Sequence, residues 1–257
     1  MLKNAGAYGV DTCCSSFVTM TEVAASLVQS GAKKKILVVS SFIDSHVLDR
    51  STHFSVDTGD AAVAAIVTLT PDAKGYLASH SLSHGSRHDG IIYQRRSPLL
   101  LKRLDSGPDY SQMFTTFYNP AANKEIAKNA ASDLKFVVDK SLEKAGLKVS
   151  DINLLATHQP VVWAGEVWRE SIGVPPNRFH QTFEKYANIA TCSAAVNLLE
   201  SIELGLVASG DKVIFASSGA GENHISIIME LSQVLINNVL ENSYQTTYQL
   251  ENEFSRN

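Results

Sequence analysis

Two adjacent cysteines stand where a predicted short buried strand, 7–12, gives way to a predicted helix, 15–30. The first turn of a helix has free N–H groups and the positive end of the helix dipole, and both favour a reactive thiolate. The same N–H groups can hold an oxyanion. Cysteine is also a common small core residue. We therefore take Cys14 as a candidate nucleophile, with packing as the alternative, and assign Cys13 and Cys192 to packing.

Two polar residues further along the chain could act on the same substrate. His158 ends the predicted apolar strand 151–158, and open α/β sheets place their sites at the carboxyl ends of strands. Asn188 precedes the predicted helix 192–210, where it can cap the helix or offer its amide N–H to a ligand. A single histidine or asparagine is often structural, so both residues keep that alternative.

The segment SSGAGENH, residues 217–224, joins two predicted strands with small residues. Its glycines, Gly219 and Gly221, allow either a tight turn or a close approach of the backbone to a ligand. Ala220 lies between them.

Three histidines, His80, His84 and His88, recur at four-residue spacing in a Ser- and Gly-rich stretch. We interpret them as solvated, with a metal site as the alternative. No histidine pair has the spacing of metal ligands on a predicted helix, so we expect no bound metal.

These residues need elements to position them, and the apolar patterns predict an α/β protein with buried strands. The expected helices are 15–30, 123–147, 161–173 and 192–210, and the expected strands are 34–41, 59–69, 151–158, 211–218 and 223–231. Gly31 and Gly146 suit helix ends, because glycine readily takes a positive φ. The stretch 71–120 reads as connecting loops.

An internal repeat links the two cysteine-bearing segments. Residues 14–41 align with residues 192–218, and both run Cys-Ser, helix, Ser-Gly, Lys, strand, Ser-Ser. The repeat predicts a duplicated α/β unit whose halves pack face to face. The alternative is that unrelated helix–Gly–strand segments look alike.

Composition limits the class of protein. The chain has 257 residues, 44% of them hydrophobic, which suffices for one sizeable domain or two closely packed ones. A net charge of −4 gives no sign of a nucleic-acid or membrane surface. Three cysteines fit reduced thiols, and neither a signal peptide nor a spanning segment is visible, so we expect a cytoplasmic protein.

The ordered motifs together resemble the thiolase-fold condensing enzymes, and most of all 3-oxoacyl-ACP synthase III. The resemblance runs from about residue 7 to residue 231. It implies a duplicated thiolase-like fold of α and β layers, with mixed sheets and a buried central helix in each half. The matching segments are DTCCSSF, SGAKKKILVV, TGDAAVA, HQPVV, ANIATCS and GAG.

The resemblance also implies a mechanism. Cys14 would take an acyl group from a CoA or carrier-protein thioester, with the backbone N–H groups of Cys14 and Ala220 holding the oxyanion. His158 and Asn188 would then stabilise the enolate formed when a malonyl thioester loses carbon dioxide. The substrate would contact Gly219, Gly221 and Phe17. Such enzymes need no cofactor besides their thioester substrates, and the family suggests a homodimer formed through strand 34–42.

On this basis we divide the chain into four parts. They are a partial N-terminal half with the nucleophile (1–70), connecting loops and a substrate cover (71–120), a C-terminal half with the histidine and asparagine (121–234), and a polar tail (235–257) that begins helical and then frays. Within the second part, segments 97–104 and 113–118 could cover an acyl tunnel or simply pack.

The chain also departs from the family pattern. The family has further strands and helices before the strand that leads to the cysteine, so we expect a fragment, a misplaced start or a second polypeptide. Ala187 and Ala220 replace glycines, and no basic residue follows HQPVV until Arg169. These differences favour a specialised relative, such as a polyketide ketosynthase. Two alternatives stay open: an O- or N-acyltransferase with His158 as general base, and a non-catalytic subunit that needs a full-length partner.

Overall fold

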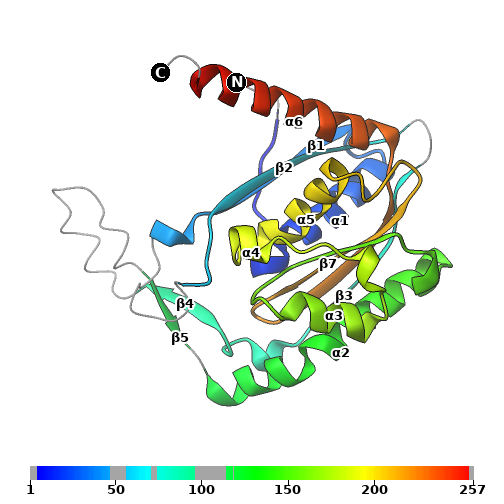
Figure 1. The fold of residues 1–257 in the computed structure, drawn as a ribbon. Coiled ribbons are helices and arrows are strands. Elements are labelled where there is room, and N and C mark those ends of the chain that lie inside the picture. Colours follow the sequence, from blue (N-terminus) through cyan, green and yellow to red (C-terminus); the bar gives the residue numbers. More distant parts are fainter. Residues whose placement is uncertain (1–4, 47–55, 71–73, 96–113, 118, 255–257) are drawn as a thin grey trace.

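The computed structural model describes residues 5–46, 56–70, 74–95, 114–117 and 119–254. Helices and strands alternate along most of this length (Figure 1). The helices are α1 (Ser16–Gln29), α2 (Pro120–Ala145), α3 (Ala164–Ile172), α4 (Phe183–Tyr186), α5 (Ser193–Glu203) and α6 (Gln233–Phe254). The strands are β1 (Lys35–Phe42), β2 (Ala61–Thr68), β3 (Gly75–Ser83), β4 (Ile92–Arg95), β5 (Phe114–Phe117), β6 (Leu154–Thr157), β7 (Lys212–Gly219) and β8 (Asn223–Glu230).

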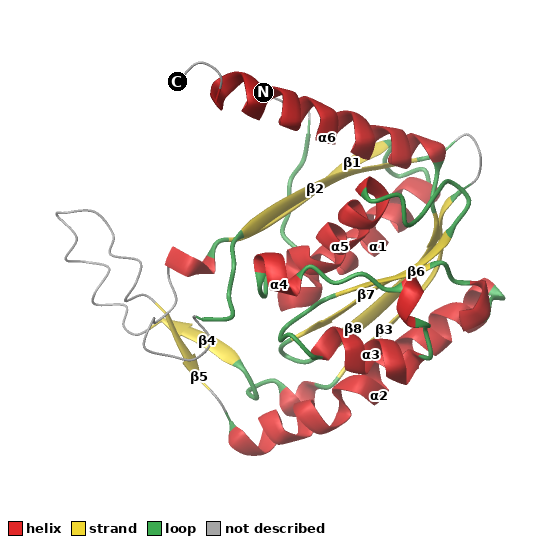
Figure 2. Cartoon of the chain, viewed as in Figure 1, coloured by secondary structure: helices red, strands yellow, loops and turns green. Residues whose placement is uncertain are grey.

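The elements form alternating layers. A four-stranded sheet, in the order β3-β8-β7-β6, has α2 and α3 on one face and α1 and α5 on the other (Figure 2). The two-stranded sheet β1-β2 lies beyond α1 and α5. One apolar cluster fills the space between α2, α3 and the large sheet, and a second joins α1 and α5 to both sheets. This is the layered, duplicated α/β architecture that the sequence predicts.

The large sheet is mixed. Strand β6 pairs parallel with β7, whereas β8 pairs antiparallel with both β7 and β3. All four residues of β6 are buried, as a strand covered on both faces requires. The sheet therefore brings the end of β6 beside β7, and both lead toward the predicted site.

The duplication is visible in the backbone. Each half has a three-residue 3-10 turn, a buried helix and an antiparallel strand pair: Cys13–Ser15, α1, β1 and β2 in one, and Ala190–Cys192, α5, β7 and β8 in the other. Each turn opens on a residue with positive φ, 55° at Cys13 and 43° at Ala190. Cys13 therefore corresponds to Ala190 and Cys14 to Thr191, so the predicted alignment of Cys14 with Cys192 is wrong by one residue.

The helix ends follow the sequence signals. Asn119 caps α2 by accepting the N–H groups of Ala121 and Ala122, and Pro120 fills the first position, where no N–H is needed. Gly146 ends the helix at φ 67°. The C-terminal end lies within two residues of the prediction, whereas the helix begins three residues before the predicted start at residue 123.

Three expectations about the elements are wrong. Residues 7–12 form no strand and are largely exposed. The stretch 71–120 is more than loops, because β3 forms an edge of the large sheet. Three consecutive polar residues, Ser79 to Ser81, interrupt its apolar residues, which an edge strand allows. Strands β1 and β2 are buried on one face only.

The predicted polar tail is helical as far as Phe254, in α6. Of the two candidate tunnel segments, residues 97–104 lie outside the described residues, and Phe114–Phe117 form β5. No described helix combines the length and apolarity needed to cross a bilayer.

Candidate active site

The turn Cys13–Ser15 is fixed by short-range polar contacts. The Cys13 N–H donates to Asp11 Oδ1 at 2.8 Å, and Ser15 Oγ donates to the Thr12 carbonyl at 2.7 Å. Ser16 Oγ donates to the Cys13 carbonyl at 2.7 Å. The turn thus holds both cysteines in a defined conformation at the start of α1.

The glycine loop packs directly against this turn. A Cβ atom on Gly219 would lie 2.1 Å from the Thr12 carbonyl oxygen, so only glycine permits the observed approach. Ser217 Oγ donates to the Cys14 carbonyl at 2.9 Å. The loop therefore approaches the cysteine turn closely, and its predicted approach to a ligand stays a prediction.

The two thiols differ in their electrostatic surroundings. Their Sγ atoms are 3.8 Å apart. The pKa of Cys13 is lowered to about 7, because the Cys14 thiol and the backbone N–H groups of Ala220 and Cys14 hydrogen-bond to its sulfur and outweigh burial and the Asp11 charge. The Cys13 sulfur, burial and the Asp44 carboxylate raise the pKa of Cys14. The two N–H groups predicted to hold an oxyanion thus converge beside Cys13.

His158 and Asn188 are in contact. His158 Nε2 donates to Asn188 Oδ1 at 3.3 Å, and the same oxygen accepts the Ala190 N–H at 2.8 Å. Asn188 Nδ2 donates to no described residue, so it remains free for a ligand. Burial lowers the pKa of His158 to about 4, although the Asn188 side chain and the Ser218 backbone oppose this shift. The imidazole is therefore neutral at pH 7.

Neighbouring elements connect this pair to the cysteine turn. The His158 N–H donates to the Ala216 carbonyl of β7 at 3.2 Å, one residue before the Ser217 hydroxyl that bonds Cys14. On the other side, the turn that follows Asn188 supplies Thr191 Oγ1, which accepts the Phe17 N–H at 2.9 Å. The fold thus brings the predicted cysteine, histidine and asparagine segments together.

Two further predicted residues have packing roles. Phe17 is buried in the core, with its ring edge-on to Phe215 at a centroid distance of 6.3 Å. Its contact with substrate stays a prediction that this packing does not favour. Cys192 is buried, and its Sγ lies 3.6 Å from the Ala61 carbonyl oxygen. Burial raises its pKa to about 11, which suits the packing interpretation.

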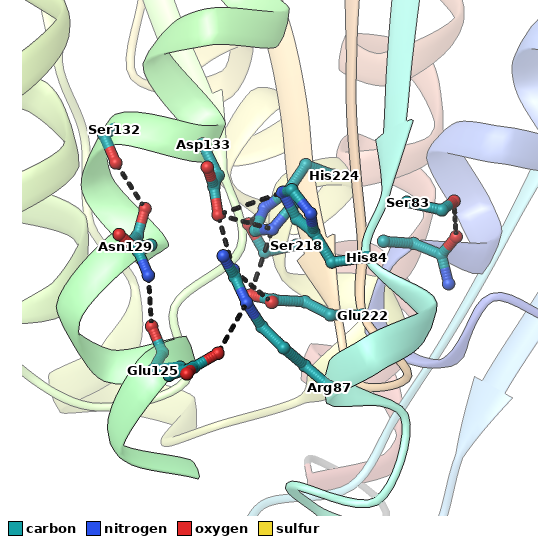
Figure 3. Close-up of polar contacts among 11 residues, drawn as sticks. Ser83, His84, Arg87, Glu125, Asn129, Ser132, Asp133, Ser218, Glu222 and His224 are labelled. Atoms are coloured by element: carbon teal, nitrogen blue, oxygen red, sulfur yellow. Dashed lines mark hydrogen bonds and ion pairs between the residues drawn. The ribbon is translucent and has the colours of Figure 1, made fainter. Parts of the chain in front are cut away.

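A partly buried ionic cluster behind the glycine loop was not predicted from the sequence (Figure 3). Arg87 Nη1 donates to Asp133 Oδ2 at 2.7 Å and to Glu222 Oε2 at 2.8 Å. His224 Nε2 lies 3.0 Å from Glu222 Oε1, and His84 Nε2 lies 3.3 Å from Asp133 Oδ2. These five residues come from distant parts of the chain. The only local signal was a carboxylate and a histidine, Glu222 and His224, at the end of the small-residue segment 217–224.

The cluster has ligand atoms that could bind a metal, since those of Asp133, Glu222 and His224 lie within 4.8 Å of one another. However, the Arg87 guanidinium already forms ion pairs with both carboxylates. We therefore interpret the cluster as an ion-pair network that anchors Glu222, next to Gly221. His80 instead contacts Lys144, so the three predicted loop histidines do not form one cluster.

A cysteine turn in one half and a His–Asn pair in the other, on a duplicated α/β unit, is the arrangement of the thiolase superfamily. Residues 8–85 match the sequence model of 3-oxoacyl-[acyl-carrier-protein] synthase III, and residues 142–231 match that of its C-terminal part. The chain belongs to this 3-oxoacyl-ACP synthase III family.

Comparison with individual proteins also supports membership of this family. The chain is 25% identical over 224 residues to the 2-heptyl-4(1H)-quinolone synthase subunit PqsC of Pseudomonas aeruginosa, covering 87% of this chain and 63% of that protein. It is 29% identical over 225 residues to the β-ketoacyl-ACP synthase III of Aquifex aeolicus, covering 86% of this chain and 66% of that protein. The chain thus spans about two thirds of the length of these relatives.

Solved structures show the same fold. The 3-oxoacyl-ACP synthase III crystal structure from Aquifex aeolicus has a TM-score of 0.74 at 25% identity, covering 89% of this chain and 68% of that one. The priming β-ketosynthase of the R1128 polyketide pathway has a TM-score of 0.76 at 22% identity, covering 90% and 67%.

Proposed function

We propose that this chain carries out thioester-dependent acyl transfer followed by decarboxylative condensation. The observation that carries the proposal is the meeting of the cysteine turn with the Gly219–Gly221 loop and the His158–Asn188 pair. Family membership supports the reaction class.

In the first stage, Cys14 attacks the carbonyl carbon of an acyl-CoA or acyl-carrier-protein thioester. The tetrahedral oxyanion is held by the backbone N–H groups of Cys14 and Ala220, both of which act on the neighbouring Cys13 sulfur in this structure. Collapse of this intermediate expels the CoA or carrier thiol and leaves the acyl group on Cys14.

In the second stage, the carbonyl oxygen of a malonyl thioester binds the Asn188 amide and the His158 imidazole. As carbon dioxide leaves, negative charge moves onto that oxygen, and preorganised donors stabilise it. The resulting carbanion attacks the acyl-Cys14 carbonyl. The neutral His158 imidazole has one N–H, at Nε2, which donates to Asn188 Oδ1 in this structure and would turn to the substrate oxygen when the malonyl thioester binds.

The low basicity of His158 also bears on the alternative of plain O- or N-acyl transfer. A general base works best with a pKa near the operating pH, whereas the pKa of His158 is about 4. This observation favours condensation over base-catalysed transfer to an alcohol or amine. Similarity to β-ketoacyl-ACP synthase III and to PqsC supports a role in fatty-acid or specialised biosynthesis.

The test is product chemistry with matched variants. The protein, loaded with an acyl-CoA, is given malonyl-CoA or malonyl-carrier protein, and carbon dioxide and the 3-oxoacyl product are measured. We expect both from the wild type and neither from Cys14→Ala. Transfer to an added alcohol or amine without carbon dioxide release would replace condensation with the acyltransferase function.

We also propose that the protein acts as a homodimer formed at the β1–β2 sheet. The outward face of this sheet presents Leu37, Val39 and Ile66 at 54%, 54% and 69% exposure. Apolar residues gathered on one face of a sheet are typical of an interface. Light scattering should give a dimer for the wild type and a monomer for Leu37→Asp. A stable complex only with a second polypeptide would instead support the partner-dependent alternative.

A further inference from the structure

The second cysteine has a place that packing alone does not explain. Cys13 takes a φ of 55°, a region that few residues other than glycine adopt. The corresponding residue in the other half, Ala190, has φ 43° and no thiol. The turn therefore does not need a sulfur at this position, yet the half with the proposed nucleophile has one.

The sulfur of Cys13 is held at the centre of the site. It lies 3.8 Å from Cys14 Sγ, within hydrogen-bonding distance for two sulfur atoms, and the backbone N–H groups of Ala220 and Cys14 lower its pKa. We propose that Cys13 is the general base for Cys14: its thiolate takes the Cys14 proton as Cys14 attacks the thioester. This inference rests on the proposed function, in which Cys14 is the acyl acceptor.

The charges around the two cysteines are consistent with Cys13 as the base and Cys14 as the nucleophile. Asp11 beside Cys13 and Asp44 beside Cys14 both oppose a thiolate, and His158 is neutral. Glu222, next along the loop, is paired with Arg87 and His224. Despite Asp11, the pKa of Cys13 is about 7, a suitable value for a base near neutral pH, while that of Cys14 is raised. The more basic thiolate is also the better nucleophile once formed.

The step balances without any further reactant. The Cys14 S–H proton passes to the Cys13 thiolate, and the Cys14 sulfur forms the new C–S bond. The thioester C–S bond then breaks, and Cys13 returns the proton to the departing CoA or carrier thiolate. While Cys13 is neutral, its two N–H partners are released to the oxyanion that forms on the thioester carbonyl. The two N–H groups therefore stabilise one negative charge at each stage, first on the Cys13 thiolate and then on the oxyanion.

The experiment measures acyl loading and thiolate formation against pH in the full chain. Acyl-CoA adducts are followed by intact mass and located by fragmentation, and thiolate is followed by absorbance at 240 nm. The variants are Cys13→Ala, Cys14→Ala and the control Cys192→Ala, which removes a thiol outside the site. We expect wild type and Cys192→Ala to load with a rise near pH 7. Cys13→Ala should load about 100-fold more slowly at pH 7, with its rise displaced to higher pH, and Cys14→Ala should not load.

Two results would overturn the inference. One is a Cys13→Ala protein that loads with the wild-type rate and pH dependence. The other is a Cys14→Ala protein that carries the acyl group on Cys13, which would make Cys13 the acceptor. If wild type accepts no acyl group from any thioester, the proposed function fails and the base role falls with it. The absorbance titration then still shows whether Cys13 holds the lower-pKa thiol.

Discussion

Asp11 and Asn188 occupy equivalent positions in the two halves of the molecule. Each accepts, through Oδ1 and at 2.8 Å, the N–H of the residue two positions later, which has positive φ. In one half that residue is Cys13, and in the other it is Ala190. The same hydrogen bond therefore holds the turn that carries Cys13 in one half and orients the Asn188 amide in the other.

This equivalence predicts the effect of Asp11→Asn. The amide keeps an oxygen for the Cys13 N–H but loses the charge that raises the pKa of Cys13. We expect the pKa of Cys13 to fall below about 7, so that thiolate forms at lower pH. Iodoacetamide alkylation followed across pH checks this. An unchanged or raised alkylation midpoint would show that the Asp11 charge does not act on the thiol.

His158→Ala and Asn188→Ala should separate the two stages of the proposed reaction. Each variant removes one donor for the developing enolate, so decarboxylation should slow by roughly 10²- to 10³-fold. Loading of Cys14 should persist, because the proposed oxyanion donors are the backbone N–H groups of Cys14 and Ala220, which neither substitution removes. Carbon dioxide release and intact mass measure the two stages. Equal loss of both stages in a folded variant would contradict these roles.

Burial of neutral His158 should make stability depend on pH. Its pKa is about 4 in the folded protein against an ordinary value of 6.5, so the unfolded chain binds the proton first as pH falls. The free energy of unfolding is unaffected by this proton above pH 6.5. As pH falls from 6.5 to 4, it decreases by a total on the order of 3 kcal/mol. Urea unfolding should show this loss shrinking in His158→Gln but not in His88→Gln, where the histidine is exposed. Equal losses in both variants would argue against it.

The ionic cluster behind the loop should be strongly stabilising as a unit. Arg87→Met leaves the buried Glu222 and the partly buried Asp133 without their counter-charge, which should cost about 3 kcal/mol. The control Lys140→Met breaks an exposed pair with Glu143, which solvent screens, and should change the free energy of unfolding far less. Similar free energies of unfolding for the two variants would show that the cluster is not a structural unit.

Gly219→Ala should damage both stability and loading. Its Cβ would meet the Thr12 carbonyl at 2.1 Å, so the loop must move away from the cysteine turn. We expect a loss of about 1–3 kcal/mol and slower loading of Cys14. Gly85→Ala is the matched control, because a Cβ there meets nothing within 4 Å. A Gly219→Ala protein as stable and as active as this control would mean that the approach is not required.

Much of this protein was determined by local sequence. The ends of α2 follow from Asn119, Pro120 and Gly146, since capping and positive φ are decided within one turn. The apolar runs predicted β6, β7 and β8, and the repeated helix–strand sequence pattern predicted the duplication. The order of the cysteine, histidine and asparagine motifs sufficed to indicate the family. The roles of Cys14, His158 and Asn188 stay predictions until the variants are made.

Only the tertiary structure decided the rest. Strand β3 looked like a loop because an edge strand gains its order from pairing with β8, 140 or more residues away. The Arg87 cluster joins residues that no spacing connects, and the one-residue offset between the halves shows only in φ. The difference between the two thiols depends on the Ala220 N–H, which the other half of the fold brings to Cys13. These features depend on contacts between residues that are far apart in the sequence. The different environments of two adjacent cysteines therefore cannot be predicted from the sequence alone.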